Sequence, residues 1–104
     1  MLRHMLLVKT KADVSPEALS KARQAFTQAP DIFDGLIRVE WGFNHSPEGL
    51  NRGFDLCILM TFTDKQARDA YLPHPDHDRL KVDFLPIIDD IIVVDFDSEA
   101  SEPY

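Results

Sequence analysis

The sequence is poor in the residues that mark exported, nucleic-acid-binding or membrane proteins. One cysteine among 104 residues cannot form a disulfide within the chain, and nothing else marks an oxidising compartment. The 11 lysines and arginines are outnumbered by 18 acidic residues, and the net charge of −7 disfavours nucleic acid and anionic lipid headgroups. No apolar run approaches the ~20 residues of a membrane span, and the first residues are too short for a signal peptide. These absences predict a cytoplasmic protein without nucleic-acid or membrane partners.

The first half of the chain predicts two strands and a helix. With 44% hydrophobic and 28% charged residues, the chain has the size and composition of one globular domain. Residues 2–10 form an apolar run, typical of a strand that is covered on both faces. A cap, a proline and an acid at 15–17 open a helix, which we expect Pro30 to close. Residues 36–44 alternate between apolar and polar, as a half-exposed strand does.

The second half predicts two further strands and an interrupted helix. Residues 54–62 are apolar on both faces, so Cys57 is expected to be an inert buried thiol. Thr63 and Gln66 match a capping box for the next helix. Residues 91–96 form the last strand, which ends a domain at 1–97, and residues 98–104 form an acidic tail. The loop at 45–53 is longer than a tight hairpin needs, its role is unassigned, and His45 within it is expected to be solvated.

The order of elements predicts an α+β, ferredoxin-like fold. The order βαββαβ, with right-handed crossovers, places the helices on one face of a four-stranded antiparallel sheet. Strands one, three and four nevertheless have apolar residues on both faces. The face without helices therefore needs a partner, and a second copy is the simplest one. We predict a homodimer formed through the sheet faces.

The stretch Tyr-Leu-Pro-His-Pro-Asp-His at 71–77 holds two of the four histidines. Pro73 should end the helix that carries Tyr71, and Pro75 is well placed as the first residue of a new helix. His74 then caps that helix. In the new helix, residues 77, 80 and 84 (His, Leu and Phe) share one face, so His77 is predicted to point inward.

These features together resemble the stress-responsive dimeric α/β-barrel family, often called Dabb. The resemblance is carried by four segments: His4 with the apolar run behind it, and residues 46–55, 71–77 and 93–96. It covers residues 2 to 97, and the His-Pro-x-His element with its upstream tyrosine is its most specific part. It implies a ferredoxin-like protomer whose sheet pairs with that of its twin. It does not imply one function, since members include stress-induced proteins and a plant branch that cyclises polyketide chains.

The same resemblance implies a candidate site. The cyclase branch uses a tyrosine and a histidine that match Tyr71 and His77, in a cavity between sheet and helices, and a histidine matching His4 lies near it. A further cavity histidine of that branch falls at Leu56 here, which implies a different substrate. The chemistry suits these residue types: imidazole takes a proton near neutral pH, and a phenol donates a hydrogen bond to an enolate oxygen.

Plainer interpretations of the same residues stay open. His77 and His4 can be core histidines bonded to the backbone, and Tyr71 can be packing with a hydrated hydroxyl. A metal site built from His4, His74 and His77 is disfavoured, because His74 and His77 point in different directions. We therefore predict no metal and no cofactor.

Two functions remain from the sequence. One is a binder or cofactor-independent cyclase- or lyase-type enzyme for a small hydrophobic oxygenated molecule. The other is a stable dimer without catalysis, acting in the stress response or as an assembly module. The sequence does not name the ligand.

Overall fold

Residues 1–99, the part of the chain that the computed structural model describes, form four strands and three α-helices. Most of the predicted acidic tail, at 100–104, lies outside the described residues. In chain order the elements are β1 (Leu2–Thr10), α1 (Pro16–Ile32), β2 (Leu36–Phe43), β3 (Leu56–Phe62), α2 (Lys65–Tyr71), α3 (Pro75–Phe84), a 3₁₀ turn (Leu85–Ile87) and β4 (Ile88–Asp97).

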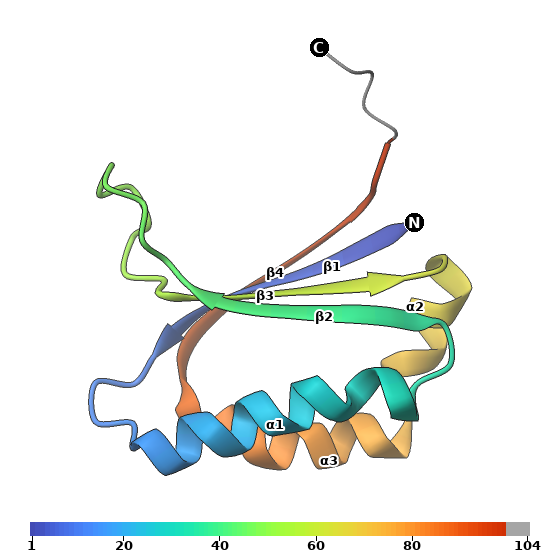
Figure 1. The fold of residues 1–104 in the computed structure, drawn as a ribbon, viewed down its shortest axis with the longest axis horizontal. Coiled ribbons are helices and arrows are strands. Elements are labelled where there is room, and N and C mark those ends of the chain that lie inside the picture. The colour runs from blue at the N-terminus through green and yellow to red at the C-terminus, as the bar shows by residue number, and fades with distance from the viewer. Residues whose placement is uncertain (100–104) are drawn as a thin grey trace.

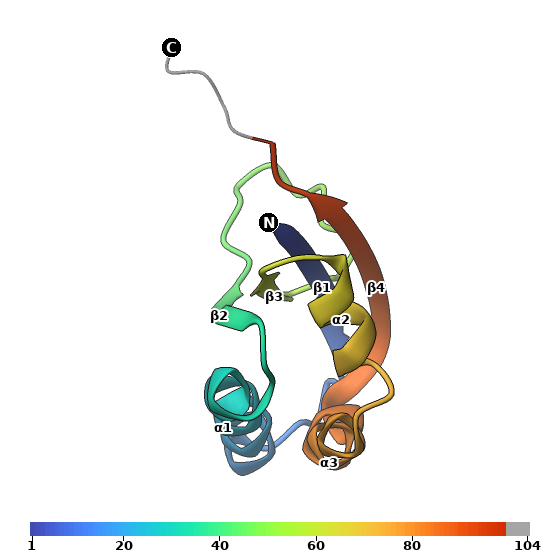
Figure 2. The same ribbon diagram turned by 90° about the vertical axis from the view of Figure 1, so that its right-hand side faces the viewer.

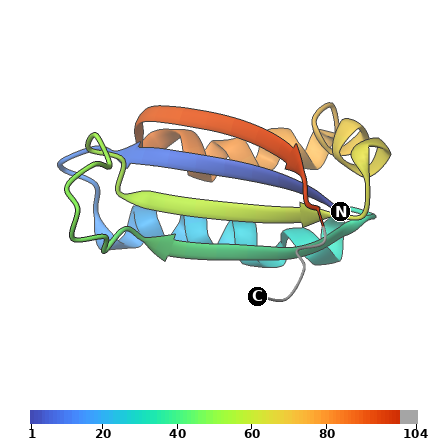
Figure 3. The same ribbon diagram turned by 90° about the horizontal axis from the view of Figure 1, so that it is seen from above.

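The strands form one antiparallel sheet in the order β2-β3-β1-β4. Helices α1 and α3 lie side by side beneath one face of the sheet, and α2 lies at one end (Figures 1 and 2). No helix of the described residues covers the other face, which is turned toward the viewer in Figure 3. We call this the open face. The predicted ferredoxin-like fold, with its helices on one face, is confirmed.

The core lies between the sheet and the helices. Along β1, alternate residues are buried, and His4 is among them at 5% exposed. His4, Leu6 and Val8 therefore share the side of β1 that faces the helices. The interior is filled by large apolar side chains from every layer, because a close-packed core leaves few voids; it includes Phe26, Phe33, Leu56, Ile58, Met60, Phe62, Tyr71, Leu80 and Phe84.

The prediction that Pro30 ends α1 is wrong, because the helix continues to Ile32. A proline in the last turn removes only one donor, the bond from its own nitrogen to the carbonyl four residues earlier. The N–H of Phe33 still donates to the carbonyl of Ala29 at 3.0 Å and closes the turn. Phe33 and Ala29 are both buried, so packing holds this turn against the core.

The capping box predicted for α2 is also wrong. The cap is Asp64, whose carboxylate accepts a hydrogen bond from the N–H of Ala67 at 2.9 Å. Thr63 lies one residue before the cap, and its N–H donates to the carbonyl of Gly35. Aspartate serves as well as threonine at this position. The helix itself still begins and ends close to where the sequence placed it.

Cys57 is exposed, and the prediction of a buried thiol is wrong for the single chain. Its neighbours in β3, Leu56 and Ile58, point toward the helices and are fully buried. Because side chains alternate along a strand, Cys57 lies on the open face. The apolar run of β3 therefore indicates a face that needs a partner rather than one that the protomer covers itself.

Candidate functional site

Tyr71, at the end of α2, is the centre of a cluster of rings between the sheet and the helices. Its side chain is 2% exposed. The ring centroid of His77 lies 4.5 Å from that of Tyr71, and the ring of His4 lies 6.1 Å away. Phe33 and Phe62 complete the surroundings at 4.7 and 5.2 Å. The structure thus brings together the three residues that the sequence singled out, and we call Tyr71, His77 and His4 the ring cluster.

The break between α2 and α3 places two members of this cluster. α2 ends at Tyr71, and α3 begins at Pro75 with His74 as its cap, as predicted. The Nδ1 atom of His74 accepts a hydrogen bond from the N–H of Asp76 at 3.0 Å. The N–H of His77 donates to the carbonyl of His74 at 2.9 Å, so His77 lies in the first turn of α3. The turned chain brings the His77 ring back onto Tyr71.

His77 is half-buried, and its Nδ1 atom is buried without a hydrogen-bond partner among the described residues. Burial lowers the pKa of His77, and the positive charge of Lys81 lowers it further. The neutral imidazole is therefore the favoured form near neutral pH. An uncharged ring with an unpaired nitrogen can accept a proton or hydrogen-bond a ligand or water.

The hydroxyl of Tyr71 is also weakly satisfied. Its hydrogen bond goes to the Sδ atom of Met60 at 3.9 Å, and a thioether is a weak acceptor. Burial raises the pKa of Tyr71, so the phenol keeps its proton. Tyr71 is thus a buried donor that lacks a strong acceptor, in ring contact with a buried acceptor on His77.

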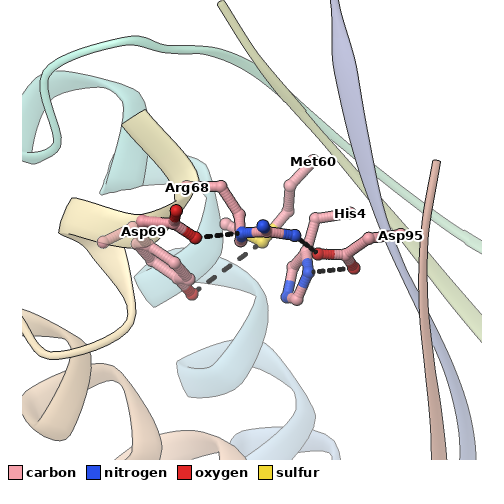
Figure 4. A network of polar contacts seen from close by, with 6 residues as sticks. His4, Met60, Arg68, Asp69 and Asp95 are labelled. Atoms are coloured by element: carbon pink, nitrogen blue, oxygen red, sulfur yellow. Dashed lines mark hydrogen bonds and ion pairs between the residues drawn. The ribbon is translucent and has the colours of Figure 1, made fainter. Parts of the chain in front are cut away.

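His4 has charged partners that sequence reasoning missed. Its Nδ1 atom lies 2.6 Å from Oδ1 of Asp95 in β4, and Arg68 in α2 donates from Nη1 to Oδ2 of Asp95 at 2.5 Å (Figure 4). Arg68 also donates from Nε to Asp69 at 2.9 Å. One signal for Asp95 was available: it is the only acid between Ile91 and Phe96, and antiparallel pairing of β1 with β4 sets it opposite His4. Arg68 gave no such signal.

The space around the ring cluster is small. Tyr71 lines a hollow of about 140 Å³ together with Phe33, His74 and neighbouring residues. Neither His77 nor His4 lines that hollow, so it is not the shared cavity that the resemblance implied for Tyr71 and His77. A larger hollow of about 490 Å³ lies between α1 and α3, with Phe33 and Leu80 in its wall. Pockets for drug-sized ligands span about 300–1,000 Å³. The hollow at Tyr71 therefore suits only a small molecule.

Neither a metal cluster nor a membrane-spanning helix is found in the part of the chain that is described. Within residues 1–99, no three His, Cys, Asp or Glu side chains gather in a way that could hold a metal ion. In the same range, none of the helices has the length and apolar character needed to cross a bilayer. The candidate site consists of the ring cluster and of the contacts that join His4 to Asp95 and Asp95 to Arg68.

Comparison with known proteins identifies the family. Residues 2–98 match the family described as the stress responsive A/B barrel domain. The chain belongs to this family. Among curated A/B barrel proteins, the chain is similar to the stress-response A/B barrel domain-containing protein HS1 of Arabidopsis thaliana. The two are 28% identical over 95 residues, which cover 91% of this chain and 87% of that protein. The family predicted from the segments around His4 and Tyr71 is confirmed.

Solved structures agree with this A/B barrel assignment. The protein At3g17210 of Arabidopsis thaliana superposes with a TM-score of 0.90 at 26% identity, over 99% of this chain and all of that chain. A dimeric ferredoxin-like protein from Jannaschia sp. CCS1 has a TM-score of 0.74 at 28% identity, over 93% and 98% of the two chains. The hydroxynitrile lyase of Passiflora edulis has a TM-score of 0.84 at 18% identity, over 98% and 96%, and shares the fold.

Proposed function

We propose that this A/B barrel protein binds a small hydrophobic, oxygenated molecule at the ring cluster and acts on it by acid–base chemistry without a cofactor. One observation carries the proposal: the Tyr71 hydroxyl and the His77 Nδ1 atom are buried in contacting rings, and neither has a strong hydrogen-bond partner. Buried polar groups without partners are rare in proteins and call for a ligand, a water or a reaction. A carbonyl compound accepts a hydrogen bond from the Tyr71 hydroxyl, and the hydrogen on the carbon beside its carbonyl group is the one that the lone pair of His77 can take.

The chemistry follows from the protonation states. His77, neutral because burial lowers its pKa, uses its nitrogen lone pair to take a proton from the carbon beside a carbonyl group. The electrons of the broken C–H bond form the C=C bond of an enolate, and the carbonyl oxygen becomes negative. Tyr71 donates its O–H hydrogen bond to that oxygen. The enolate carbon then either takes the proton back from His77, or attacks a second carbonyl group, whose oxygen becomes negative and takes that proton from His77.

The family supports a reaction of this kind. Tyr71 and His77 match the tyrosine and histidine of the polyketide-cyclising branch that the chain resembles. A protein with the same fold is a hydroxynitrile lyase, so the fold holds a lyase in at least one case. A small substrate fits better than a long polyketide, because the hollow beside Tyr71 is about 140 Å³. Independence from metal and cofactor, and a cytoplasmic location, stay predictions.

A second function, a stable dimer without catalysis, is favoured by the packing around the site. The buried rings of Phe33 and Phe62 lie 4.7 and 5.2 Å from the ring of Tyr71 and fill space between the sheet and the helices. His77 lies against Tyr71 rather than in the wall of its hollow. In this alternative the three rings only pack, and the protein acts through its surface in the stress response or in assembly.

Both functions include a homodimer through the open face. Ile92, Val94 and Phe96 lie opposite the residues of β1 that point away from the helices, and they are 41%, 49% and 45% exposed. A hollow of about 310 Å³ on the same face is lined by Leu7, Leu50 and other residues at the base of the loop after β2. Exposed apolar patches of this kind mark interaction sites. Several solved neighbours are described as dimeric, which supports a second copy as the partner.

Deuterium exchange tests the proposed chemistry without knowledge of the natural substrate. A base at the ring cluster should speed the exchange of hydrogens beside the carbonyl of small aliphatic ketones in D₂O, followed by proton NMR. We expect His77→Ala to reduce the rate by about 100-fold or more, and Tyr71→Phe to reduce it less. His45→Ala, which removes an exposed loop histidine, is the matched control and should exchange like the wild type.

The opposite result is equally clear. Two results together would support the dimer without catalysis. The wild type would exchange no ketone faster than His77→Ala does, and the only effect of the substitution would be a lower melting temperature of the protein. Circular dichroism of each variant shows whether a lost rate comes from a lost fold.

A further inference from the structure

Arg68 links α2 to the edge strand β4 through the carboxylate that also holds His4. It donates from Nη1 to Oδ2 of Asp95 at 2.5 Å, while Oδ1 of Asp95 lies 2.6 Å from Nδ1 of His4 (Figure 4). The two oxygens of Asp95 thus have different partners on opposite sides. A carboxylate held at both oxygens cannot rotate without breaking one contact, so Arg68 fixes the oxygen that His4 meets.

The contacts run inward from the surface. Arg68 and Asp95 line a hollow of about 140 Å³ at the edge of the sheet, where their side chains are 18% and 22% exposed. The side chain of His4 is only 7% exposed, and its ring meets the ring of Tyr71 at 6.1 Å and 68°. The chain of contacts therefore joins a solvent-reached ion pair to the ring cluster.

The direction of the hydrogen bond follows from the donors available. Hydrogen bonds to Asp95 and Asp69 raise the pKa of Arg68, so it stays charged. An ionised carboxylate only accepts hydrogen bonds, so the proton between Asp95 and His4 belongs to Nδ1 of His4. When His4 is neutral, its lone pair is then on Nε2, the nitrogen turned away from Asp95. Figure 4 shows this second nitrogen on the side of the ring away from Asp95.

We propose that Arg68 is a positioning residue: through Asp95 it fixes the Nδ1–H tautomer of His4, so that Nε2 offers a proton acceptor to the molecule bound at Tyr71. The role of that acceptor rests on the proposed function, whereas the tautomer does not. Arg68 thereby makes His4 a third polar group of the site, with a fixed direction, beside Tyr71 and His77.

A purely structural ion pair predicts something different. Ion pairs that solvent reaches contribute little to stability, and Arg68 has a second carboxylate, Asp69, at 2.9 Å. If Arg68 only stabilised α2, its removal would lower stability and leave the ring of His4 unchanged. A change in the proton position on His4 therefore separates positioning from stabilisation.

The test compares four proteins by long-range ¹H–¹⁵N NMR of the histidine rings at about pH 8, where histidine is largely neutral. They are the wild type, Arg68→Met, Arg68→Lys and the control Arg79→Met, which removes an arginine that is 84% exposed on α3. We expect Nδ1–H and an unprotonated Nε2 on His4 in the wild type and in Arg79→Met. Arg68→Met frees the Asp95 carboxylate to rotate away from Nδ1, so this variant should shift His4 toward a mixture with Nε2–H, and Arg68→Lys should restore most of the wild-type pattern.

The ketone exchange rate of the same proteins separates this proposal from the proposed function. We expect Arg68→Met to lose about 10-fold in rate, with partial rescue in Arg68→Lys. A tautomer shift in Arg68→Met with no exchange in the wild type would support the positioning role and count against the proposed chemistry. An unchanged His4 tautomer in folded Arg68→Met overturns the positioning role. If Arg68→Met does not fold, Asp95→Leu removes the acceptor through which Arg68 acts, and an unchanged Nδ1–H tautomer there overturns the positioning role too.

Discussion

At the scale of single residues, sequence reasoning found the rings but not the charges. Tyr71 and His77 stand in a motif with fixed spacing around two prolines, and His4 has its place in the family pattern. Asp95 contacts His4 directly, and Arg68 reaches it through Asp95. Both are far from His4 in the sequence, because Asp95 lies in β4 and Arg68 in α2. A contact across 91 residues leaves no local pattern, although the strand pairing that the fold implies would have set Asp95 opposite His4.

The pH dependence of stability should report the burial of His77. The folded state lowers its pKa, while the unfolded chain binds a proton near the ordinary value of about 6.5. As pH falls through this value, the unfolded state binds more protons and the free energy of unfolding decreases. We expect urea unfolding between about pH 8 and 5 to show a smaller loss of stability in His77→Gln than in the wild type.

The expected difference is small, because His77 is only half-buried and solvent screens part of the effect of burial. His45→Gln is the matched control, since His45 is exposed in the loop after β2. Its stability should follow the wild type at every pH. If the free energy of unfolding changes equally with pH in His77→Gln and in the wild type, the ring of His77 is as hydrated in the folded chain as in the unfolded one.

At the scale of elements, the types and order were predictable and the ends were less so. Helix breaks at Pro73 and Pro75 were predicted correctly, because two prolines separated by one residue leave no room for a continuous helix. Pro30 carried the same signal and misled, because the buried Phe33 and Ala29 hold the last turn of α1 in place. β4 begins at Ile88, earlier than the apolar run from Ile91, since backbone pairing with β1 needs no apolar side chain.

The cap of α3 should be measurable as stability. His74 satisfies the N–H of Asp76, and it also lies 5.1 Å from the ring of Phe33. His74→Ala and His74→Asn both remove the ring contact, but only asparagine still caps the helix. We expect the alanine variant to be less stable than the asparagine variant by about 1 kcal/mol, or a difference of about 4–8 °C in Tm. Equal thermal and urea midpoints for the two variants would mean that the cap contributes nothing.

At the scale of the whole molecule, the open face is the feature that the sequence predicted best. Strands with apolar residues on both faces implied a partner, and the structure leaves Ile92, Val94 and Phe96 exposed on that face. The error at Cys57 has the same origin: its strand has apolar residues on both faces, and one of these faces is left uncovered in the single chain. No pattern in the sequence reports how closely Phe33 and Phe62 pack against Tyr71 in the ring cluster.

Native mass spectrometry of the purified protein tests the central claim, a paired protein with a ligand at the ring cluster, most directly. We expect the mass of two chains carrying a small organic adduct, present at purification or after incubation with small aliphatic ketones. The adduct should be lost in His77→Ala and kept in His45→Ala, with both variants still paired. If the wild type after such incubation has the mass of the polypeptide alone, as His77→Ala does, the result would contradict a binding site at Tyr71 and His77.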